Sequence, residues 1–316
     1  MEEVYSRLRA TDLSEQQIKS LQRSKVAVIG LGATGSVIAE SLARYGVKLK
    51  IIDRDYLEPN DLYSSSIYTL EDVEKSLPKA KAASKKLGEI TEVEERVESL
   101  RPGNISTLLE DIDLIIDGTD NLETRLLINE YCQREGKPWI YTAALADQGY
   151  SMLLKDKCFN CIFRQVKPEK LGTCRSEGIE RDIAAMAAHR SSYKAFKHLT
   201  GREVEQDLHI LPEAEAFKVE CKGCKICKEE EYEYLGTSKQ VSSVCGEDKY
   251  RITIDASDEV IKKFEEEAEE LKASNSYLVR GCVDGREIVV YRSGEILVEA
   301  ENSGHAEAVL SEVLGI

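Results

Sequence analysis

The stretch Lys-Val-Ala-Val-Ile-Gly-Leu-Gly-Ala-Thr-Gly-Ser, residues 25–36, decides the fold of this 316-residue chain. It joins a short apolar run to the pattern Gly-x-Gly-x-x-Gly, and residues 36–45 then repeat apolar side chains at helical spacing. A strand, a glycine turn and a helix in this order let backbone amides approach a phosphate group, and the helix N-terminus adds positive potential. The stretch therefore predicts nucleotide-binding positions at Gly30, Gly32, Thr34 and Gly35.

Alternating strand and helix patterns continue to about residue 145. Strands are expected at 26–29, 48–53, 93–100, 113–117 and 139–144, and helices at 36–45, 79–90 and 123–134. Such alternation predicts an α/β fold, namely a Rossmann-like, doubly wound and mainly parallel sheet. A polar loop over 155–182 and a helix over 181–200 follow.

The pattern changes beyond about residue 236. A strand at 251–254 and a charged helix at 258–272 precede three strands, at 277–283, 286–292 and 295–299, and a last helix at 305–314. The dipeptides Asp-Gly and Ser-Gly between these strands are tight-turn signals. We therefore expect two domains, a larger α/β domain over 1–235 that contains the glycine turn, and a small β-α-β-β-β-α module of the α+β class over 236–316.

Charge and composition exclude some classes of partner. The chain has 43 basic and 58 acidic residues, a net charge of −15, which disfavours a nucleic acid because no basic excess offsets its phosphates. The first residues are acidic and do not resemble a signal peptide, and no apolar run approaches the roughly 18 residues of a membrane span. We expect a cytoplasmic protein that binds neither nucleic acid nor membrane.

Charged residues stand where the predicted sheet should bind a ligand. Asp53 ends the strand after the glycine turn, where a carboxylate can accept hydrogen bonds from ribose hydroxyls. Lys79 follows Pro78 at a predicted helix start and could reach a triphosphate. Asp120 ends a strand at the carboxyl edge of the sheet and could hold Mg²⁺. A turn aspartate that only caps the next helix is the alternative for Asp120.

Five of the nine cysteines form two spaced groups, Cys158-x-x-Cys161 and Cys221-x-x-Cys224-x-x-Cys227. In a reducing compartment such pairs favour a metal over disulfides, and four thiolates from distant segments are typical of a tetrahedral zinc site. The second group contains two overlapping pairs, so one of its thiols should be spare.

Taken together, these motifs resemble the ubiquitin-activating-enzyme-like adenylyltransferases, the ThiF/MoeB/HesA group, over about residues 3–235. The resemblance implies ATP, Mg²⁺ and Zn²⁺ as cofactors. It also implies transfer of AMP from ATP to a carboxylate, with release of pyrophosphate.

The resemblance assigns a role to individual residues. Tyr-Ser-Arg at 5–7 matches a motif whose arginine enters the partner subunit's ATP site, so it implies a homodimer with Arg7 acting in trans. Cys174 stands where some members carry a thiol that bonds to the activated partner. The other implied positions are ribose binding by Asp53 and Asp55, phosphate binding by Lys79, magnesium binding by Asp120 beside Asn121, and zinc binding by Cys158, Cys161, Cys224 and Cys227, with Cys221 as the alternative ligand.

One segment departs from the family pattern. The family usually carries Ser-Asn-Leu-x-Arg-Gln after the ribose acids, and the aligned residues 60–65 here read Asn-Asp-Leu-Tyr-Ser-Ser. Ser64 thus replaces an arginine that contacts the triphosphate, and Asp61 replaces the asparagine. A charged hydrogen bond is worth roughly 1.5–3 kcal/mol, so another cation, Arg54 or Lys81, would have to compensate.

Four functions remain open. The C-terminal glycine of a small ubiquitin-like or sulfur-carrier protein is the family's usual substrate, and a small-molecule carboxylic acid of cofactor biosynthesis is the alternative that the altered segment 60–65 favours. An NAD oxidoreductase would explain the glycine turn but not the cysteine pairs or Arg7. A non-catalytic nucleotide-binding scaffold would explain Ser64.

Overall fold

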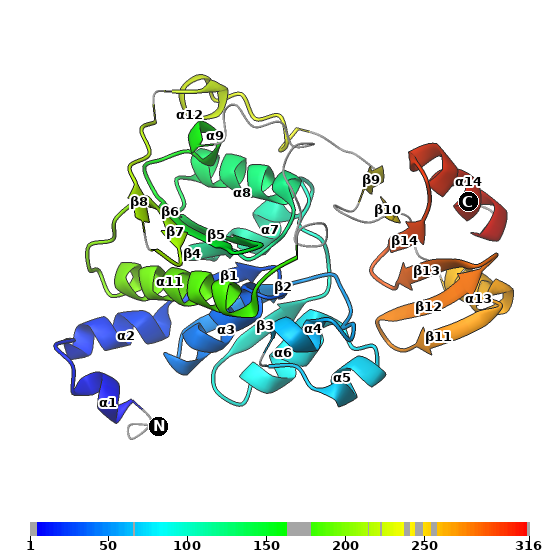
Figure 1. The fold of residues 1–316 in the computed structure, drawn as a ribbon, viewed down its shortest axis with the longest axis horizontal. Helices are drawn as coiled ribbons and strands as arrows, with labels where there is room; N and C mark the ends of the chain where they lie inside the picture. The colour runs from blue at the N-terminus through cyan, green and yellow to red at the C-terminus, as the bar shows by residue number, and fades with distance from the viewer. Residues whose placement is uncertain are drawn as a thin grey trace. The chain divides into compact units, whose positions relative to one another are not determined.

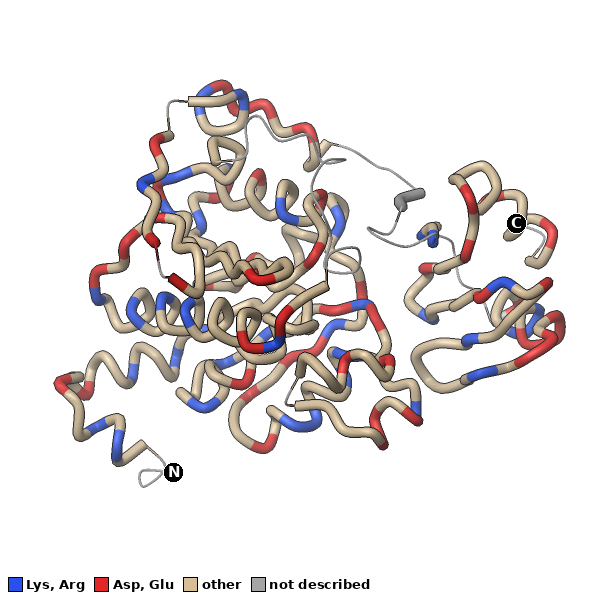
Figure 2. Tube along the Cα trace, viewed as in Figure 1, with Lys and Arg blue, Asp and Glu red and all other residues tan. Residues whose placement is uncertain are grey.

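The computed structural model describes residues 5–65, 67–162, 178–213, 215–221, 223–236, 241–243, 249–253 and 258–314. The chain divides into two compact units, Met1–Thr237 and Ser238–Ile316 (Figure 1). Basic and acidic residues occur along the chain in both units (Figure 2). Within the described residues, no helix combines the length and the apolar character that crossing a membrane requires.

An eight-stranded sheet forms the centre of the first unit, in the order β3-β2-β1-β4-β5-β6-β7-β8. The strands from β3 to β5 are parallel, and β6, β7 and β8 add to them in antiparallel fashion. The mainly parallel α/β fold is thereby confirmed. The bounds are β1 Lys25–Ile29, β2 Lys48–Ile52, β3 Val93–Arg96, β4 Leu114–Asp117, β5 Trp139–Leu145, β6 Gln148–Leu154, β7 Leu208–Leu211 and β8 Glu215–Phe217.

Helices cover both faces of this sheet, so the fold is doubly wound as expected. Val26 and Val28 of β1 face a core shared with α2 (Glu15–Arg23), α3 (Gly35–Arg44), α6 (Lys79–Leu87) and α11 (Arg181–Leu199). Ala27 and Ile29 face the opposite core, against α7 (Ile105–Leu109) and α8 (Leu122–Glu135) (Figure 1). This alternation is the two-residue period of a strand that is buried on both faces. Short helices complete the unit: α1 Ser6–Arg9, α4 Asp61–Ser64, α5 Leu70–Glu74, α9 Phe159–Ile162 and α12 Lys225–Glu229.

Two expectations in this unit were wrong in detail. The strand predicted to reach residue 100 ends at Arg96, because β2 offers pairing partners only over Leu49–Ile52. The segment expected to be a loop from residue 155 begins with amides of Lys155 and Asp156 that donate to Gln206, and continues into α9. Residues 163–177 lie outside the described part. The hairpin strand β6 was not predicted, since the turn that joins it to β5 has none of the usual glycine signals.

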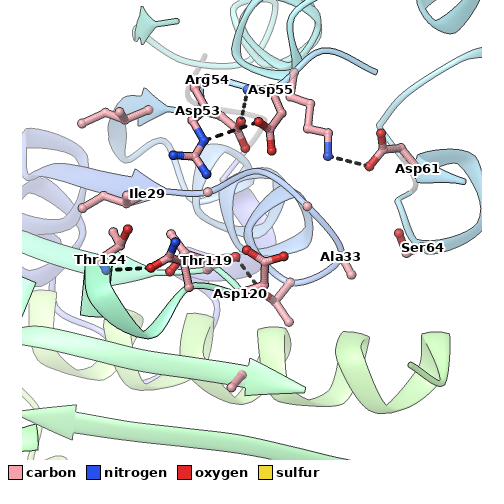
Figure 3. A pocket seen from close by; sticks show the side chains of 18 of the residues that line it. Ile29, Ala33, Asp53, Arg54, Asp55, Asp61, Ser64, Thr119, Asp120 and Thr124 are labelled. Atoms are coloured by element: carbon pink, nitrogen blue, oxygen red, sulfur yellow. Dashed lines mark hydrogen bonds and ion pairs between the residues drawn. The ribbon is translucent and has the colours of Figure 1, made fainter. Parts of the chain in front are cut away.

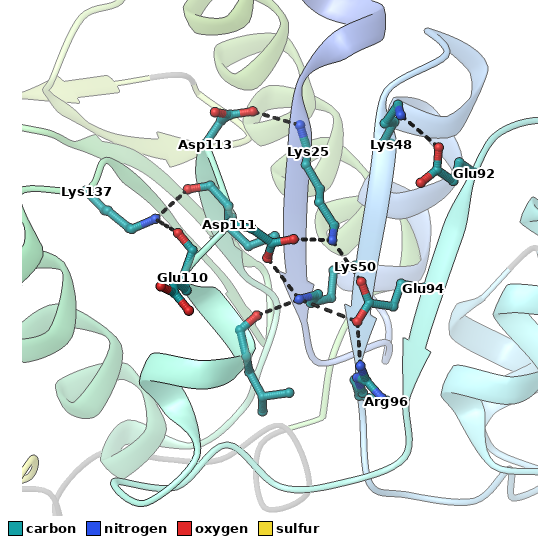
Figure 4. Close-up of polar contacts among 12 residues, drawn as sticks. Lys25, Lys48, Lys50, Glu92, Glu94, Arg96, Glu110, Asp111, Asp113 and Lys137 are labelled. Carbon is teal, nitrogen blue, oxygen red and sulfur yellow. Dashed lines mark hydrogen bonds and ion pairs between the residues drawn. The ribbon is translucent and has the colours of Figure 1, made fainter.

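A network of ion pairs ties together strand β1, strand β2, strand β3 and the loop before β4 (Figure 4). Lys25 contacts Glu94 and Asp111, and the buried Lys50 contacts Asp111 at 3.0 Å. The ammonium of Lys25 lowers the pKa of Asp111 to about 2. These four residues do not line the cavity described below, so the network stabilises the sheet rather than a binding site.

The second unit is a six-stranded antiparallel sheet in the order β11-β12-β13-β14-β10-β9, with α13 (Asp258–Glu267) and α14 (Ser303–Leu314) packed on one core. The predicted helix over 258–272 was wrong at its end, because α13 stops at Glu267 and β11 pairs with β12. Residues 270–274 form backbone hydrogen bonds with the edge of β12 instead of extending the helix, so the module has more strands than expected. The strands are β9 Val241–Ser243, β10 Lys249–Thr253, β11 Glu270–Ser274, β12 Leu278–Val283, β13 Arg286–Tyr291 and β14 Glu295–Glu299.

Candidate functional site

A cavity of about 310 Å³ opens at the carboxyl ends of β1, β2 and β4 (Figure 3). Its wall combines the glycine turn, the residues after β2, helix α4, the start of α6 and the loop between β4 and α8. The sheet order reverses at this point, since β2 lies on one side of β1 and β4 on the other. Open α/β sheets bind ligands at such a position.

The glycines of the turn have different structural roles. Gly30 has a φ of +82°, and a Cβ there would lie 2.9 Å from backbone atoms of Gly118 and Thr119. A Cβ on Gly35 would lie 1.8 Å from the carbonyl oxygen of Gly30. By contrast, a Cβ on Gly32 would meet nothing within 4 Å, and Gly32 lines the cavity. Gly30 and Gly35 therefore permit close packing, whereas Gly32 leaves space for a ligand.

We expect these glycines to respond oppositely to alanine. Gly35→Ala should destabilise the first unit by about 3 kcal/mol or more, because the clash is with backbone. Gly32→Ala should leave the melting temperature unchanged and weaken ATP binding about tenfold. Differential scanning calorimetry and titration calorimetry with ATP measure the two effects. Equal losses of stability in both variants would contradict this division of roles.

Asp53 connects the end of β2 to the glycine turn. Its Oδ2 accepts a hydrogen bond from the amide of Leu31 at 2.6 Å, and its Oδ1 accepts one from the amide of Asp55 at 2.7 Å. Burial, together with the neighbouring carboxylate of Asp55, raises the pKa of Asp53 to about 6. Each carboxylate oxygen has a second lone pair, so Asp53 can still accept from a ligand hydroxyl.

Lys79 begins α6 and lines the cavity, where it forms an ion pair with Asp61 of α4. Its Nζ lies 2.8 Å from Oδ1 of Asp61, and both side chains are largely buried, at 14% and 11% exposure. Burial alone would lower the pKa of Lys79, but the carboxylates of Asp61, Asp55 and Asp53 raise it. Lys79 is therefore charged at neutral pH. Its ion-pair partner is Asp61, the residue that replaces the asparagine of the family pattern.

The two candidates to replace the missing family arginine lie in different places. Lys81 is paired with Glu95 at 2.8 Å and does not line the cavity. Arg54 lines it, donates to the Ser99 hydroxyl at 3.3 Å and lies 3.5 Å from Asp55. Of the two, only Arg54 has a position from which it can meet a ligand.

The loop after β4 is built around a buried ion pair that sequence reasoning did not identify. Asp117, fully buried at the end of β4, accepts from Arg125 Nε at 3.0 Å and from the Thr119 hydroxyl at 2.6 Å. Arg125 also donates to the carbonyl of Thr119. Burial raises the pKa of Asp117, and the guanidinium of Arg125 opposes that shift. The pair fixes the loop that carries Asp120.

Asp120 is exposed in this loop and lines the cavity, three residues beyond the end of β4. The expectation that Asp120 itself ends the strand was wrong, because the ladder to β5 stops at Asp117. The capping alternative was also wrong, since Asn121 caps α8 by accepting from the Thr124 amide at 3.0 Å. Asp120 is thus left facing the cavity, and Asn121 lines it while serving as a cap.

Four thiols gather at a distance from the cavity. Cys158, Cys161, Cys224 and Cys227 have sulfur atoms within 4.8 Å of one another. The Sγ–Sγ distances are 3.8 Å for 158–224, 3.7 Å for 161–227 and 3.5 Å for 224–227. Thiolates about 2.3 Å from a tetrahedral zinc ion lie about 3.8 Å apart, so this donor set fits the metal. Cys221 is outside the group, although its Sγ lies 3.0 Å from that of Cys161.

Helix α8 supports the cysteine group through residues that carry no sequence motif. Asn129 donates to Cys158 Sγ at 3.3 Å and accepts from the amide of Phe159 at 2.9 Å. The buried Glu130 accepts from the amides of Glu233 and Leu235 at 3.1 and 2.9 Å. Hydrogen bonds to a ligand atom, and to the backbone that carries the ligands, hold metal ligands in place.

Of the other predicted residues, one stands apart from the cavity and one is not described. Arg7 is exposed on α1 and does not line the cavity of its own chain. Cys174 lies outside the described residues.

Comparison with known proteins identifies the family. The ThiF family model matches residues 5–234. The chain belongs to the ThiF family. It is 30% identical over 318 residues to the sulfur carrier protein ThiS adenylyltransferase of Bacillus subtilis, an alignment that covers 94% of each protein. It is 28% identical over 194 residues to the sulfur carrier protein adenylyltransferase of Thermus thermophilus, with 57% of this chain and 71% of that protein covered.

Other relatives share a smaller part. The adenylyltransferase and sulfurtransferase MOCS3 of Arabidopsis thaliana is 34% identical over 154 residues, which are 47% of this chain and 33% of that protein. Among solved structures, the crystal structure of MccB from E. coli superposes with a TM-score of 0.58 at 17% identity, covering 71% of this chain and 72% of that one. This structural likeness supports the fold, and the family match confirms the resemblance predicted from the motifs.

Proposed function

We propose that this member of the ThiF family transfers AMP from ATP to the C-terminal carboxylate of a small ubiquitin-like or sulfur-carrier protein and releases pyrophosphate. The observation that carries the proposal is the meeting of the glycine turn, Lys79 and Asp120 around one cavity. The relative that aligns over 94% of the chain, named as a ThiS adenylyltransferase, supports the acceptor class.

The charge of the cavity supports a metal–nucleotide complex as the ligand. Among the described residues, its wall has five acidic side chains, of Asp53, Asp55, Asp61, Glu98 and Asp120, and three basic ones, of Arg54, Lys79 and Arg125. Arg125 is already paired with Asp117. A triphosphate would be repelled by this excess of carboxylates unless a divalent cation accompanied it. We assign Asp120 as the protein ligand of that Mg²⁺.

The proposed chemistry needs no nucleophile from the enzyme. An oxygen of the acceptor carboxylate attacks the α-phosphorus, and the bond to the β-phosphate oxygen breaks, so that pyrophosphate leaves with the electron pair. The enzyme contributes positioning and neutralisation of charge. The turn amides beyond Leu31, whose own amide is bonded to Asp53, and the ammonium of Lys79 would bind the phosphates. Asp53 and Asp55 would bind the ribose, and Gly32, Thr34 and Asn121 would line the nucleotide. Gly35, predicted from the sequence to bind the nucleotide, packs against Gly30 and does not line the cavity.

A homodimer is part of the proposal. Arg7 is exposed on α1 and does not line the cavity of its own chain. An arginine that enters the partner subunit's site would have this position. The four-cysteine group would hold Zn²⁺ as a structural ion joining the segment after β6 to that around α12.

A small-molecule carboxylic acid remains the second candidate acceptor. Asp61 and Ser64, which line the cavity in place of the usual asparagine and arginine, favour a site adapted to a different substrate. Membership of the ThiF family argues against the NAD oxidoreductase.

Isotopic ATP–pyrophosphate exchange tests the function, with carrier proteins ending in Gly-Gly and small carboxylates as acceptors. Exchange with carrier proteins alone supports the first candidate, and exchange with small acids alone supports the second. Absence of exchange and of any acyl-adenylate with all acceptors would favour the non-catalytic scaffold.

Asp120→Ala should lower the exchange rate about a hundredfold, because it removes the proposed Mg²⁺ ligand. Asp120 is exposed, so the variant should fold normally. Glu89→Ala, which removes another exposed acid that does not line the cavity, is the matched control. Unchanged exchange in Asp120→Ala would remove this residue from the mechanism.

A further inference from the structure

A fifth thiol touches the four-cysteine group. Cys221 is exposed, whereas Cys158 and Cys224 are buried and Cys161 and Cys227 are half-buried. The Sγ of Cys221 lies 3.0 Å from that of Cys161 and 3.4 Å from that of Cys227. The thiol that solvent reaches most easily therefore lies within 3.4 Å of the sulfurs of two of the four proposed metal ligands.

The distances separate Cys221 from the ligand set. A tetrahedral zinc ion binds four thiolates, whose sulfurs lie about 3.8 Å apart. Cys158, Cys161, Cys224 and Cys227 satisfy that geometry, and the 3.0 Å between Cys221 and Cys161 is too short for two ligands of one ion. Cys221 is thus a spare thiol that is placed to react with a ligand rather than to serve as one.

We propose that Cys221 is an oxidation site that controls the metal, with Cys161 as its resolving partner. The inference rests on the proposed zinc site. A hydroperoxide is the oxidant, and the exposed thiol of Cys221 is the first to meet it. Cys161 is the partner because its sulfur is closer to Cys221 than that of Cys227 is.

The chemistry balances in two steps. In the first, the Cys221 thiol gives up its proton and the thiolate attacks one oxygen of hydrogen peroxide, so that the O–O bond breaks; a sulfenic acid forms, and the leaving hydroxide takes the proton to give one water. In the second, the Cys161 thiolate attacks the sulfenic sulfur, and the leaving hydroxide takes a proton to give a second water. The resulting disulfide consumes one of the four ligands, so Zn²⁺ is left with three thiolates and dissociates. A dithiol reductant together with Zn²⁺ reverses the change.

The experiment follows zinc rather than adenylation. Zinc-loaded full-length protein is treated with hydrogen peroxide, release is recorded with a chromogenic zinc chelator, and disulfides are mapped by mass spectrometry of unreduced peptides. We expect wild-type protein to release zinc with formation of the Cys161–Cys221 disulfide. Cys221→Ser should release it at least tenfold more slowly, and Cys282→Ser, which removes a thiol of the second unit, should behave as wild type.

The possible outcomes are distinct. Equal release rates from wild type and Cys221→Ser, or a first disulfide between two of the four ligands, would overturn the inference while leaving the zinc site and adenylation intact. Wild-type protein that holds no zinc would overturn the proposed zinc site and the inference with it. The disulfide map of the wild type decides the matter even if Cys221→Ser fails to fold.

Discussion

Replacing Lys79 by methionine should lower ATP–pyrophosphate exchange by two to three orders of magnitude. Removing one preorganised charge that stabilises the transition state typically costs this much, and Lys79 lines the cavity from the start of α6. Methionine retains the length and the apolar stem of the side chain. The loss should appear mainly in kcat, since the ammonium neutralises charge that develops on the phosphates.

Lys81→Met is the matched control for this variant. Lys81 lies on the same helix, but it is paired with Glu95 and does not line the cavity. An exposed ion pair contributes about 0–1 kcal/mol, so the control should fold and exchange at nearly the rate of the wild type. Similar activity in the two variants would show that Lys79 does not act on the phosphates.

The pH dependence of stability adds a second readout for Lys79→Met. The ammonium of Lys79 opposes the burial and the Asp55 charge that raise the pKa of Asp53 to about 6. Without Lys79 this pKa should rise further. When the pKa of a carboxyl is higher in the folded than in the unfolded protein, the free energy of unfolding falls as pH rises from the unfolded-state pKa to the folded-state pKa. The variant should therefore lose more unfolding free energy at pH 7 than at pH 4, as urea denaturation would measure.

Replacing Cys158 by serine should release the proposed zinc ion and lower the melting temperature by about 10 °C or more. Structural zinc binding is worth several kcal/mol, and about 1 kcal/mol shifts the melting temperature of a 150–250-residue unit by about 2–4 °C. Cys158 is fully buried, and burial raises the pKa of its thiol to about 12 without a metal. The metal must displace that proton, so zinc affinity should also fall as pH falls.

Metal analysis and calorimetry measure this effect, with Cys221→Ser as the control within the same cluster. Under reducing conditions the control should retain one zinc ion per chain and the melting temperature of the wild type. A Cys158→Ser protein that keeps its metal and its stability would show that these thiols are not a structural zinc site.

Much of the fold could be predicted from local sequence signals. The glycine turn, the buried strands and the helix that begins at Lys79 are encoded within windows of about a dozen residues, and β1, β2, β4 and α6 formed close to their predicted bounds. Local signals gave a wrong prediction where the same residues could either extend a helix or pair with a neighbouring strand. The predicted helix extends to residue 272, yet residues 270–274 pair with β12, because that strand otherwise leaves its backbone groups at a sheet edge.

The sequence by itself determined the α/β class, the glycine turn and the presence of more thiols than a four-ligand metal needs. Only the tertiary structure decided that Asp61 faces Lys79, that Arg125 holds Asp117, that Asn121 rather than Asp120 caps α8, and which thiol stands outside the group of four. Backbone preferences act between neighbours along the chain and can be read from spacing. Ion pairs and metal ligands depend on distances in space between residues far apart in sequence, and those distances exist only once the sheet and its helices have packed.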